Sequence, residues 1–376
     1  MFNSMFNSMF NRQKHISKRT FFYLLLIISL PFTSHAQSEQ ALNTQFKNAY
    51  HAYQNAIKTK NSDAQFSYAK ESYQLGKKLY GNTNINTANL ALILARQHLN
   101  KKELKQANSL LLKTLDTFES EYGNNAAELA EVYILLGQSL PHKKREKSIK
   151  HYLQALNIAE KHEEERPYFN AQMQLEAGIA LLSQGSPKSR VILTAQAFFT
   201  EHLPPNDHRV VNANFYAGKY YLARSKYSKA IQNWQTNLHV FDSLEGATHP
   251  LELSTHAFLI NALEEIGKSE EATKHCIAIG SMTPWDDSQE QRPLFRSHPK
   301  YPIDYARRGK SGWVKVGFTV SDFGSVIEAK IIDSQGGKGF EKSALAALEK
   351  WRYAPKFENG EPIEAYATVQ LDFKMD

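Results

Sequence analysis

The chain has 376 residues, a formal net charge of +7 and a single cysteine. Four of the positive charges lie on Arg12, Lys14, Lys18 and Arg19, in a segment that is predicted to be removed, so the remainder carries only +3. This small surplus argues against a nucleic-acid partner, which needs a dense basic face. Because Cys276 cannot form an internal disulfide, packing must stabilise the fold.

Residues 1–36 have the pattern of a secretory signal peptide. The basic stretch is followed by an apolar run, 21–30, and then by the small residues Ser34 and Ala36, where signal peptidase cleaves. Ten to twelve apolar residues in a helix span only about 15–18 Å, against a hydrocarbon core of roughly 30 Å. We therefore expect a soluble periplasmic protein that begins at Gln37. An uncleaved inner-membrane anchor is the alternative.

Residues 37–280 show helical patterns with few prolines, and the breaks between helices repeat. A Tyr-Gly-Asn sequence at Gly81 recurs at Gly123, 42 residues later, and small residues such as Ala95 and Ala107 lie 12 apart. The pattern resembles tetratricopeptide repeats, especially the type of about 42 residues in kinesin light chains. The resemblance implies an α-solenoid of five to six helix hairpins that binds protein segments on its concave side. An irregular helical bundle is the alternative.

Residues 281–298 are predicted to be a linker. They contain Pro284 and Pro293 together with acidic and polar residues, and such a segment makes few contacts with the domains that it joins. The C-terminal part of the chain is therefore expected to fold on its own.

The C-terminal residues alternate between apolar and polar side chains in three segments. The segments 314–320 and 326–332 are separated by a turn in which Gly324 can take a positive φ, and the segment 365–373 alternates most cleanly. A helical pattern with Phe340 and Leu348 lies between the second and the third. The order predicts a three-stranded antiparallel sheet with one face covered by a helix.

This β-β-α-β order is preceded by Pro299-Lys300-Tyr301-Pro302 and contains Trp351-Arg-Tyr-Ala-Pro355 after the helix. Together these features resemble the C-terminal domain of the TonB family, over about a quarter of the chain. The predicted fold class is mainly α: an α-solenoid followed by a small α+β, TonB-like domain at 299–376. The linker is far shorter than the proline-rich spacer of typical TonB proteins, which argues against direct force transmission from the inner-membrane motor.

The resemblance also implies how partners bind. TonB-family domains add a short receptor segment to a sheet edge, and such β-augmentation relies on main-chain hydrogen bonds. We expect this edge at the last strand, with Tyr366, Thr368 and Gln370 giving side-chain selectivity, and we add Tyr301 and Pro302 as partner-binding candidates. The expected partners are a TonB-dependent outer-membrane receptor or a component of the ExbB–ExbD/TonB complex, with only indirect membrane association. A homodimer through this domain is a competing use of the edge.

No motif indicates catalysis, a cofactor or a metal. The glycine-rich segment ending at Lys338 lacks the phosphate-loop spacing, and His162 lacks a second histidine at the zincin position. Cys276 is predicted to be a small buried hydrophobe. We therefore expect a non-enzymatic, periplasmic binding protein linked to TonB-dependent transport. A scaffold in cell-envelope assembly, which uses the TonB-like domain only for docking, is the alternative.

Overall fold

The computed structural model describes residues 32–241, 250–282, 293–358 and 361–374. The chain divides into two compact units, 1–79 and 80–376. All but the last five residues of the predicted signal peptide lie outside the described part, and those five belong to helix α2 (Phe32–Lys58). Among the described helices, none is both long and apolar enough to cross a membrane.

The first unit consists of α2 and most of α3 (Ser62–Tyr80). Phe46, Tyr50 and Tyr53 recur at helical spacing on α2 and are buried. At the turn between the helices, the Gln65 side-chain amide donates a hydrogen bond of 3.2 Å to the carbonyl of Ala56. The aromatic face of α2 is thus a core face, as expected for most of the tyrosines.

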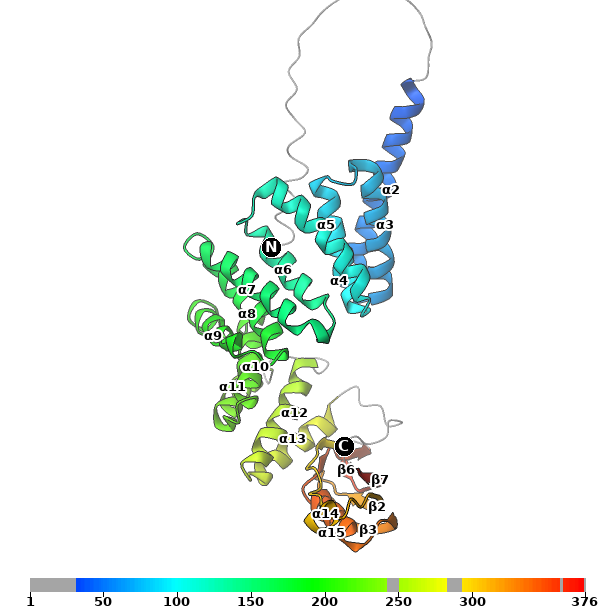
Figure 1. Cartoon of the computed structure of the whole chain (residues 1–376), viewed down its shortest axis with the longest axis vertical. Coiled ribbons are helices and arrows are strands. Elements are labelled where there is room, and N and C mark those ends of the chain that lie inside the picture. The colour runs from blue at the N-terminus through cyan, green and yellow to red at the C-terminus, as the bar shows by residue number, and fades with distance from the viewer. Residues whose placement is uncertain (1–31, 242–249, 283–292, 359–360, 375–376) are drawn as a thin grey trace, which may run out of the picture. The chain divides into compact units, whose positions relative to one another are not determined.

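The second unit begins with helix hairpins that stack in chain order (Figure 1). Each hairpin packs against the next, as the repeats in the sequence predict, so the mainly helical solenoid is confirmed. The helices are α4 (Ile85–Asn100), α5 (Leu104–Tyr122), α6 (Glu128–Gln138), α7 (Arg145–Lys161), α8 (Pro167–Ser183), α9 (Val191–His202), α10 (His208–Leu222), α11 (Tyr227–Phe241), α12 (Pro250–Glu265) and α13 (Ser269–Ser281). Short 3₁₀ turns, His142–Lys144 and Pro187–Arg190, precede α7 and α9.

Glycines at one repeated position allow the two helices of a hairpin to approach closely. Gly137, Gly178 and Gly218 lie 41 and 40 residues apart, on α6, α8 and α10. A Cβ atom at Gly178 would lie 2.6 Å from the Ile192 side chain, and one at Gly218 would meet the indole of Trp234. At each of these glycines, a large side chain of the second helix occupies the space that a Cβ atom would fill, so the glycines mark the same close contact in successive repeats.

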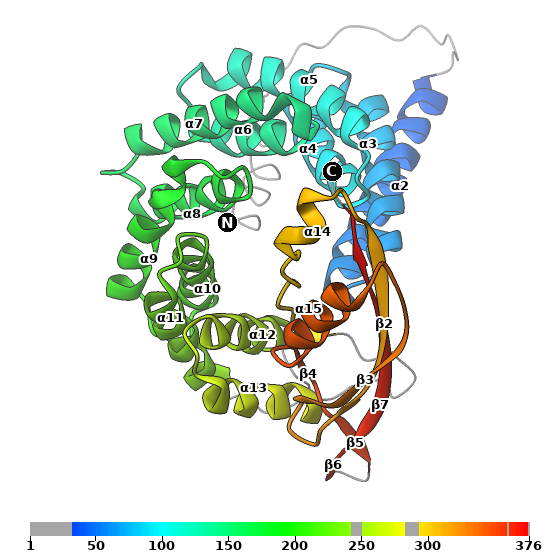
Figure 2. The ribbon, with the colours of Figure 1, turned by 60° about the horizontal axis from the view of Figure 1, so that its bottom comes forward.

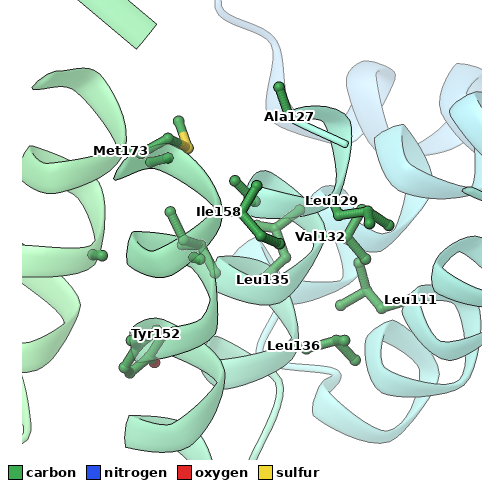
Figure 3. Close-up of a cluster of buried hydrophobic side chains, with 14 of the residues drawn as sticks. Leu111, Ala127, Leu129, Val132, Leu135, Leu136, Tyr152, Ile158 and Met173 are labelled. Atoms are coloured by element: carbon green, nitrogen blue, oxygen red, sulfur yellow. The ribbon is translucent and has the colours of Figure 1, made fainter. Parts of the chain in front are cut away.

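In the second unit, the core of the helical region consists of buried clusters that each span more than one hairpin. Figure 3 shows part of it, where side chains from α5, α6, α7 and α8 interlock. Leu129, Leu136 and Ile158 are fully buried there, and the Tyr152 ring lies against Gly137. Because each hairpin covers the apolar face of its neighbour, no hairpin has a closed core of its own.

The first helices of the hairpins line the inner side of the curved stack. Helices α4, α6, α8 and α10 contact one another in sequence, and Figure 2 shows them inside α5, α7, α9 and α11. This arrangement leaves the exposed faces of the first helices along one continuous surface.

The predicted three-stranded antiparallel sheet is present at the C-terminal end. Its order is β3 (Val326–Gln335), β2 (Gly312–Val320), β7 (Ala365–Phe373). Helix α15 (Lys338–Leu348) covers one face (Figure 2), where Val316, Phe318 and Phe340 are buried together. Gly324 has φ +82°, as the turn requires. The fold of the β-β-α-β segment is therefore as predicted.

Several small elements were not predicted. They are α14 (Ile303–Arg307) and the strand pairs β1 (Pro293–Phe295) with β4 (Arg352–Tyr353), and β5 (Lys356–Glu358) with β6 (Glu361–Ile363). Helix α15 ends at Leu348, so Trp351 lies beyond it, although its side chain is buried in the predicted core. Strand β1 lies within the predicted linker. Its pairing with β4 gives this segment backbone partners in the C-terminal domain, so the end of the predicted linker belongs to that domain.

Candidate partner-binding edge of the C-terminal sheet

Strand β7 is a long, regular strand at one edge of the sheet. Its nine residues pair with β2 in unbroken register, from Gly312 opposite Phe373 to Val320 opposite Ala365. Because β2 lies on one side only, the backbone groups on the other side of β7 have no strand partner within the described sheet. Such a row of N–H and C=O groups is a template for a further strand.

The opposite edge, β3, is irregular. Its register with β2 shifts twice, once at Ile332 and once near Glu328, and Glu328 has φ +52°. Bulges of this kind twist an edge and interrupt its row of backbone groups, which protects it from pairing. The two edges of the sheet are therefore not equivalent, and β7 is the one suited to adding a strand.

The three residues predicted for selectivity lie together on the outer face of β7. Tyr366 is 69% exposed, and Thr368 and Gln370 are also exposed. The Tyr366 hydroxyl lies over Gly317 of β2, where a Cβ atom would collide with it. The Gln370 amide donates a hydrogen bond of 3.0 Å to the Asp372 carboxylate. A strand added to this edge would run beside all three side chains.

Tyr301 and Pro302 lie apart from these three, beneath the end of the sheet. The Tyr301 ring packs against Phe340 and Phe373, with centroid separations of 5.4 and 6.0 Å, and its hydroxyl donates to the carbonyl of Lys310. Pro302 caps α14, and its carbonyl accepts hydrogen bonds from the next turn. Tyr301 therefore supports the end of β7 and Pro302 the start of α14, and a direct contact with a partner remains a prediction for both.

The C-terminal domain also packs tightly against the last helix hairpin, which contradicts the expectation of few contacts. Glu264 of α12 and Arg352 of β4 form an ion pair of 2.7 Å, with side chains 7% and 11% exposed. Phe295 and Ala354 belong to one buried cluster with apolar residues of α11, α12 and α13. The expectation was wrong because a polar linker does not prevent the domains that it joins from sharing a core.

Two glycines and the only cysteine complete this contact. A Cβ atom at Gly280 would lie 2.6 Å from the Phe357 ring and 2.8 Å from the carbonyl oxygen of Pro355. Gly324 lies against the backbone of Tyr353 and the side chain of Cys276. Cys276 is fully buried, as predicted, and burial raises the pKa of its thiol to about 12. One sequence signal was missed: Arg352 stands among apolar residues, where a charge needs a partner.

Two histidines of the same hairpin lie side by side. The Nδ1 atoms of His256 on α12 and His275 on α13 are 2.9 Å apart, and burial lowers the pKa of each to about 4. One neutral ring can donate to the other, so the pair is satisfied without a metal. Among the described residues, no group of three or more histidine, cysteine, aspartate or glutamate side chains is arranged to hold a metal ion.

Comparisons with known proteins show which family the C-terminal domain matches. Residues 297–375 match the family described as Gram-negative bacterial TonB protein C-terminal. The chain is 31% identical over 85 residues to Protein TonB of Pseudomonas aeruginosa, and 27% identical over 78 residues to Protein TonB of Vibrio cholerae. These matches cover 23% and 21% of this chain, and 25% and 32% of the two relatives, so the similarity spans only a quarter to a third of their length.

Solved structures resemble both parts of the chain. The solution structure of the Pseudomonas aeruginosa TonB C-terminal domain is 29% identical, covering 24% of this chain and 90% of that one, with a TM-score of 0.22. The crystal structure of BtubC from P. vanneervenii is 17% identical, covering 70% and 98%, with a TM-score of 0.46. From the sequence match and the observed β-β-α-β sheet, residues 297–375 of this chain are a TonB C-terminal domain, and they follow a solenoid of tetratricopeptide-like helix hairpins.

Proposed function

We propose that the protein binds an extended segment of another envelope protein along β7, as part of TonB-dependent transport across the outer membrane. The observation that carries this proposal is the contrast between the two sheet edges: the register of β7 with β2 is unbroken over nine residues, whereas that of β3 shifts twice. An added strand would gain several main-chain hydrogen bonds, each worth about 0.5–1.5 kcal/mol net. The expected partners are a TonB-dependent outer-membrane receptor or a component of the ExbB–ExbD/TonB complex. Binding by backbone pairing needs no catalytic group.

The helical region is proposed to hold a second partner on its inner side. Polar residues recur at one position of successive first helices, Asn89, Glu131, Gln172 and Asn212, spaced 42, 41 and 40 residues apart, and they are the proposed contact residues. All four are only partly buried, so they line a surface rather than a core. This proposal includes secretion to the periplasm through the predicted signal peptide, 1–36.

A scaffold in cell-envelope assembly is the second candidate. It is favoured by the buried junction between the C-terminal domain and the hairpin α12–α13, because that junction fixes the sheet to the solenoid instead of suspending it on a long spacer. Recovery of partners from an envelope extract, identified by mass spectrometry, separates the two. Receptors or motor components support the transport proposal, and assembly factors without them support the scaffold.

The edge itself is tested with a matched pair of proline substitutions in the full chain. Gln370 lies on β7 and Lys330 lies on β3, and both native side chains are exposed on edge strands. The two substitutions are Gln370→Pro and Lys330→Pro. Proline removes a backbone donor and adds bulk to the edge. Gln370→Pro should weaken binding of a fluorescent receptor-derived peptide at least tenfold in anisotropy titrations, and Lys330→Pro should leave it nearly unchanged. Circular dichroism checks that both variants are folded.

A second set of peptides tests backbone pairing directly. N-methylation removes one peptide donor at a time, and in a strand only alternate donors point toward the neighbouring strand. Binding should therefore fall at every second methylated position. Equal loss at all positions, or equal affinity of wild type and folded Gln370→Pro, would exclude β7 as the docking edge.

A further inference from the structure

The two ends of the docking edge carry opposite charge. At the end where β7 finishes, Lys374 follows Phe373, and Lys310 lies just before Gly312, the residue opposite Phe373. Arg307 and Arg308 lie in the same segment that leads into β2, and all four cationic side chains are exposed. Among the described residues of this segment and of the end of β7, the acidic ones are Asp304 and Asp372, so cations outnumber anions there.

The other end of β7 is acidic. Glu364 directly precedes Ala365, and Glu361 lies on β6, whose chain leads into β7. Asp322 follows Val320, the residue opposite Ala365. Both glutamates are exposed, and strand β5, which pairs with β6, carries the cation Lys356 opposite Ile363. Anions therefore outnumber cations at this end.

The charged ends have no ion-pair partners within the described part of the chain, although Lys310 lies over the Tyr305 ring at 4.9 Å and Asp372 accepts the hydrogen bond from Gln370. Between the ends, the outward residues Thr368 and Gln370 of β7 are neutral. The edge is thus a neutral strand with a cationic and an anionic terminus.

We propose that this charge difference selects a bipolar segment and fixes how it lies: its acidic end beside Phe373 and its basic end beside Ala365. The inference rests on the proposed function, because it assumes that a strand docks on β7. Main-chain pairing alone accepts almost any extended segment in either direction, whereas charge complementarity selects among partners and fixes register. Selectivity by charge therefore lies at the ends of the edge, in addition to any contribution from Tyr366, Thr368 and Gln370 along the strand.

The expected effect is modest and depends on salt. The side chains are exposed, so each ion pair contributes little, and charges more than about 8–10 Å apart are largely screened at physiological ionic strength. Several pairs acting together should give about a threefold to tenfold preference. The preference should shrink as salt is added, while the backbone-driven part of the affinity remains.

The experiment uses disulfide trapping in the full chain. Cys276 is the only cysteine and is fully buried, so a cysteine introduced on β7 is the reactive one. Tyr366→Cys reports on the acidic end and Gln370→Cys on the basic end. The probe is a synthetic peptide with an alternating Val-Thr core, two glutamates at one terminus and two lysines at the other, with its cysteine beside the glutamates. Both chain directions of the peptide are used.

The inference predicts that both peptides react about threefold to tenfold faster with Gln370→Cys than with Tyr366→Cys. In a background of Lys310→Glu with Lys374→Glu the preference should disappear or reverse. The matched control, Lys342→Glu with Lys350→Glu, changes the charge equally but leaves the ends of β7 intact, so the preference should remain. Equal rates at both positions, or a preference that follows chain direction instead of charge, would overturn the inference and leave edge docking standing. No trapping at either position in a folded protein would overturn both.

Discussion

The ion pair between Glu264 and Arg352 offers the strongest test of how the C-terminal domain is attached. The Arg352 Nε and Glu264 Oε1 atoms are 2.7 Å apart, and in the described structure each of these two buried atoms has this ionic contact and no hydrogen bond. The Arg352 Nη1 atom also donates a hydrogen bond of 2.9 Å to the carbonyl of Trp351, and Ser269 donates one of the same length to the other Glu264 oxygen. Glu264→Gln keeps the shape of the side chain and removes its charge.

The expected loss in the free energy of unfolding follows from the burial of both side chains. Removing one partner of a buried pair costs about 3–5 kcal/mol, because the remaining charge is left without compensation. In Glu264→Gln, the Arg352 guanidinium keeps its hydrogen bond to the Trp351 carbonyl. We therefore expect a loss of unfolding free energy near the lower end of this range, at about 3 kcal/mol. The chain supplies a matched control in Lys268 and Glu271, which are also 2.7 Å apart but 52% and 43% exposed. An exposed pair contributes about 0–1 kcal/mol, so Glu271→Gln should change the free energy of unfolding by no more than that.

Urea unfolding, followed by far-ultraviolet circular dichroism and tryptophan fluorescence, measures the loss. Agreement between the two signals is required before one free energy is assigned to a chain with several domains. The double variant Glu264→Leu with Arg352→Met should recover most of the loss, because it leaves no buried charge. If Glu264→Gln costs no more than Glu271→Gln, or if the double variant loses as much as both single variants together, the pair does not stabilise the junction.

Two further predictions follow from the helical region. Gly218→Ala should lower the free energy of unfolding by about 1–3 kcal/mol, because the added Cβ atom meets the Trp234 indole. The control Ser228→Ala, at an exposed position of α11, should change it by no more than about 0.5 kcal/mol. Equal effects of the two substitutions in urea unfolding would contradict the glycine argument. The pKa values of His256 and His275 are lowered by burial to about 4 from an unfolded value of 6.5, so the unfolded chain binds more protons between these limits and stability should fall as the pH drops from about 6.5 to 4. His275→Asn should flatten that dependence and the exposed control His142→Asn should not, and an unchanged profile for His275→Asn would refute the assignment.

The sheet was predictable because its strands alternate with a period of two. One residue of slippage would turn the whole apolar set of β7 toward water, so the pattern of Ala367, Val369 and Leu371 fixes both the face and the register. The bulges of β3 were not predicted, because two consecutive apolar residues at Ile331 and Ile332 do not by themselves distinguish a bulge from the end of a strand. The difference between the two edges therefore appeared only in the structure.

The repeats were predictable from small residues, which mark where helices approach. Ala95 and Ala107 are fully buried 12 positions apart, and Gly218 and Ala230 are buried at the same spacing. The junction with the C-terminal domain was not predictable in the same way. Glu264 and Arg352 are 88 positions apart in the sequence, and no periodic pattern relates a helix of one domain to a strand of another. Only the presence of a charge within an apolar segment indicated that a partner was needed.

The buried junction changes what binding at β7 can accomplish. A domain on a long flexible spacer can dock on a partner without affecting the rest of its chain. Here the C-terminal domain and the hairpin α12–α13 share an apolar cluster, a buried ion pair and glycine contacts, so a strand docked on β7 as proposed would be held in a defined position relative to these two helices. A second partner on the inner helices would meet the first in a set orientation. Separating the two would require opening the junction, at a cost to which the Glu264–Arg352 pair contributes directly.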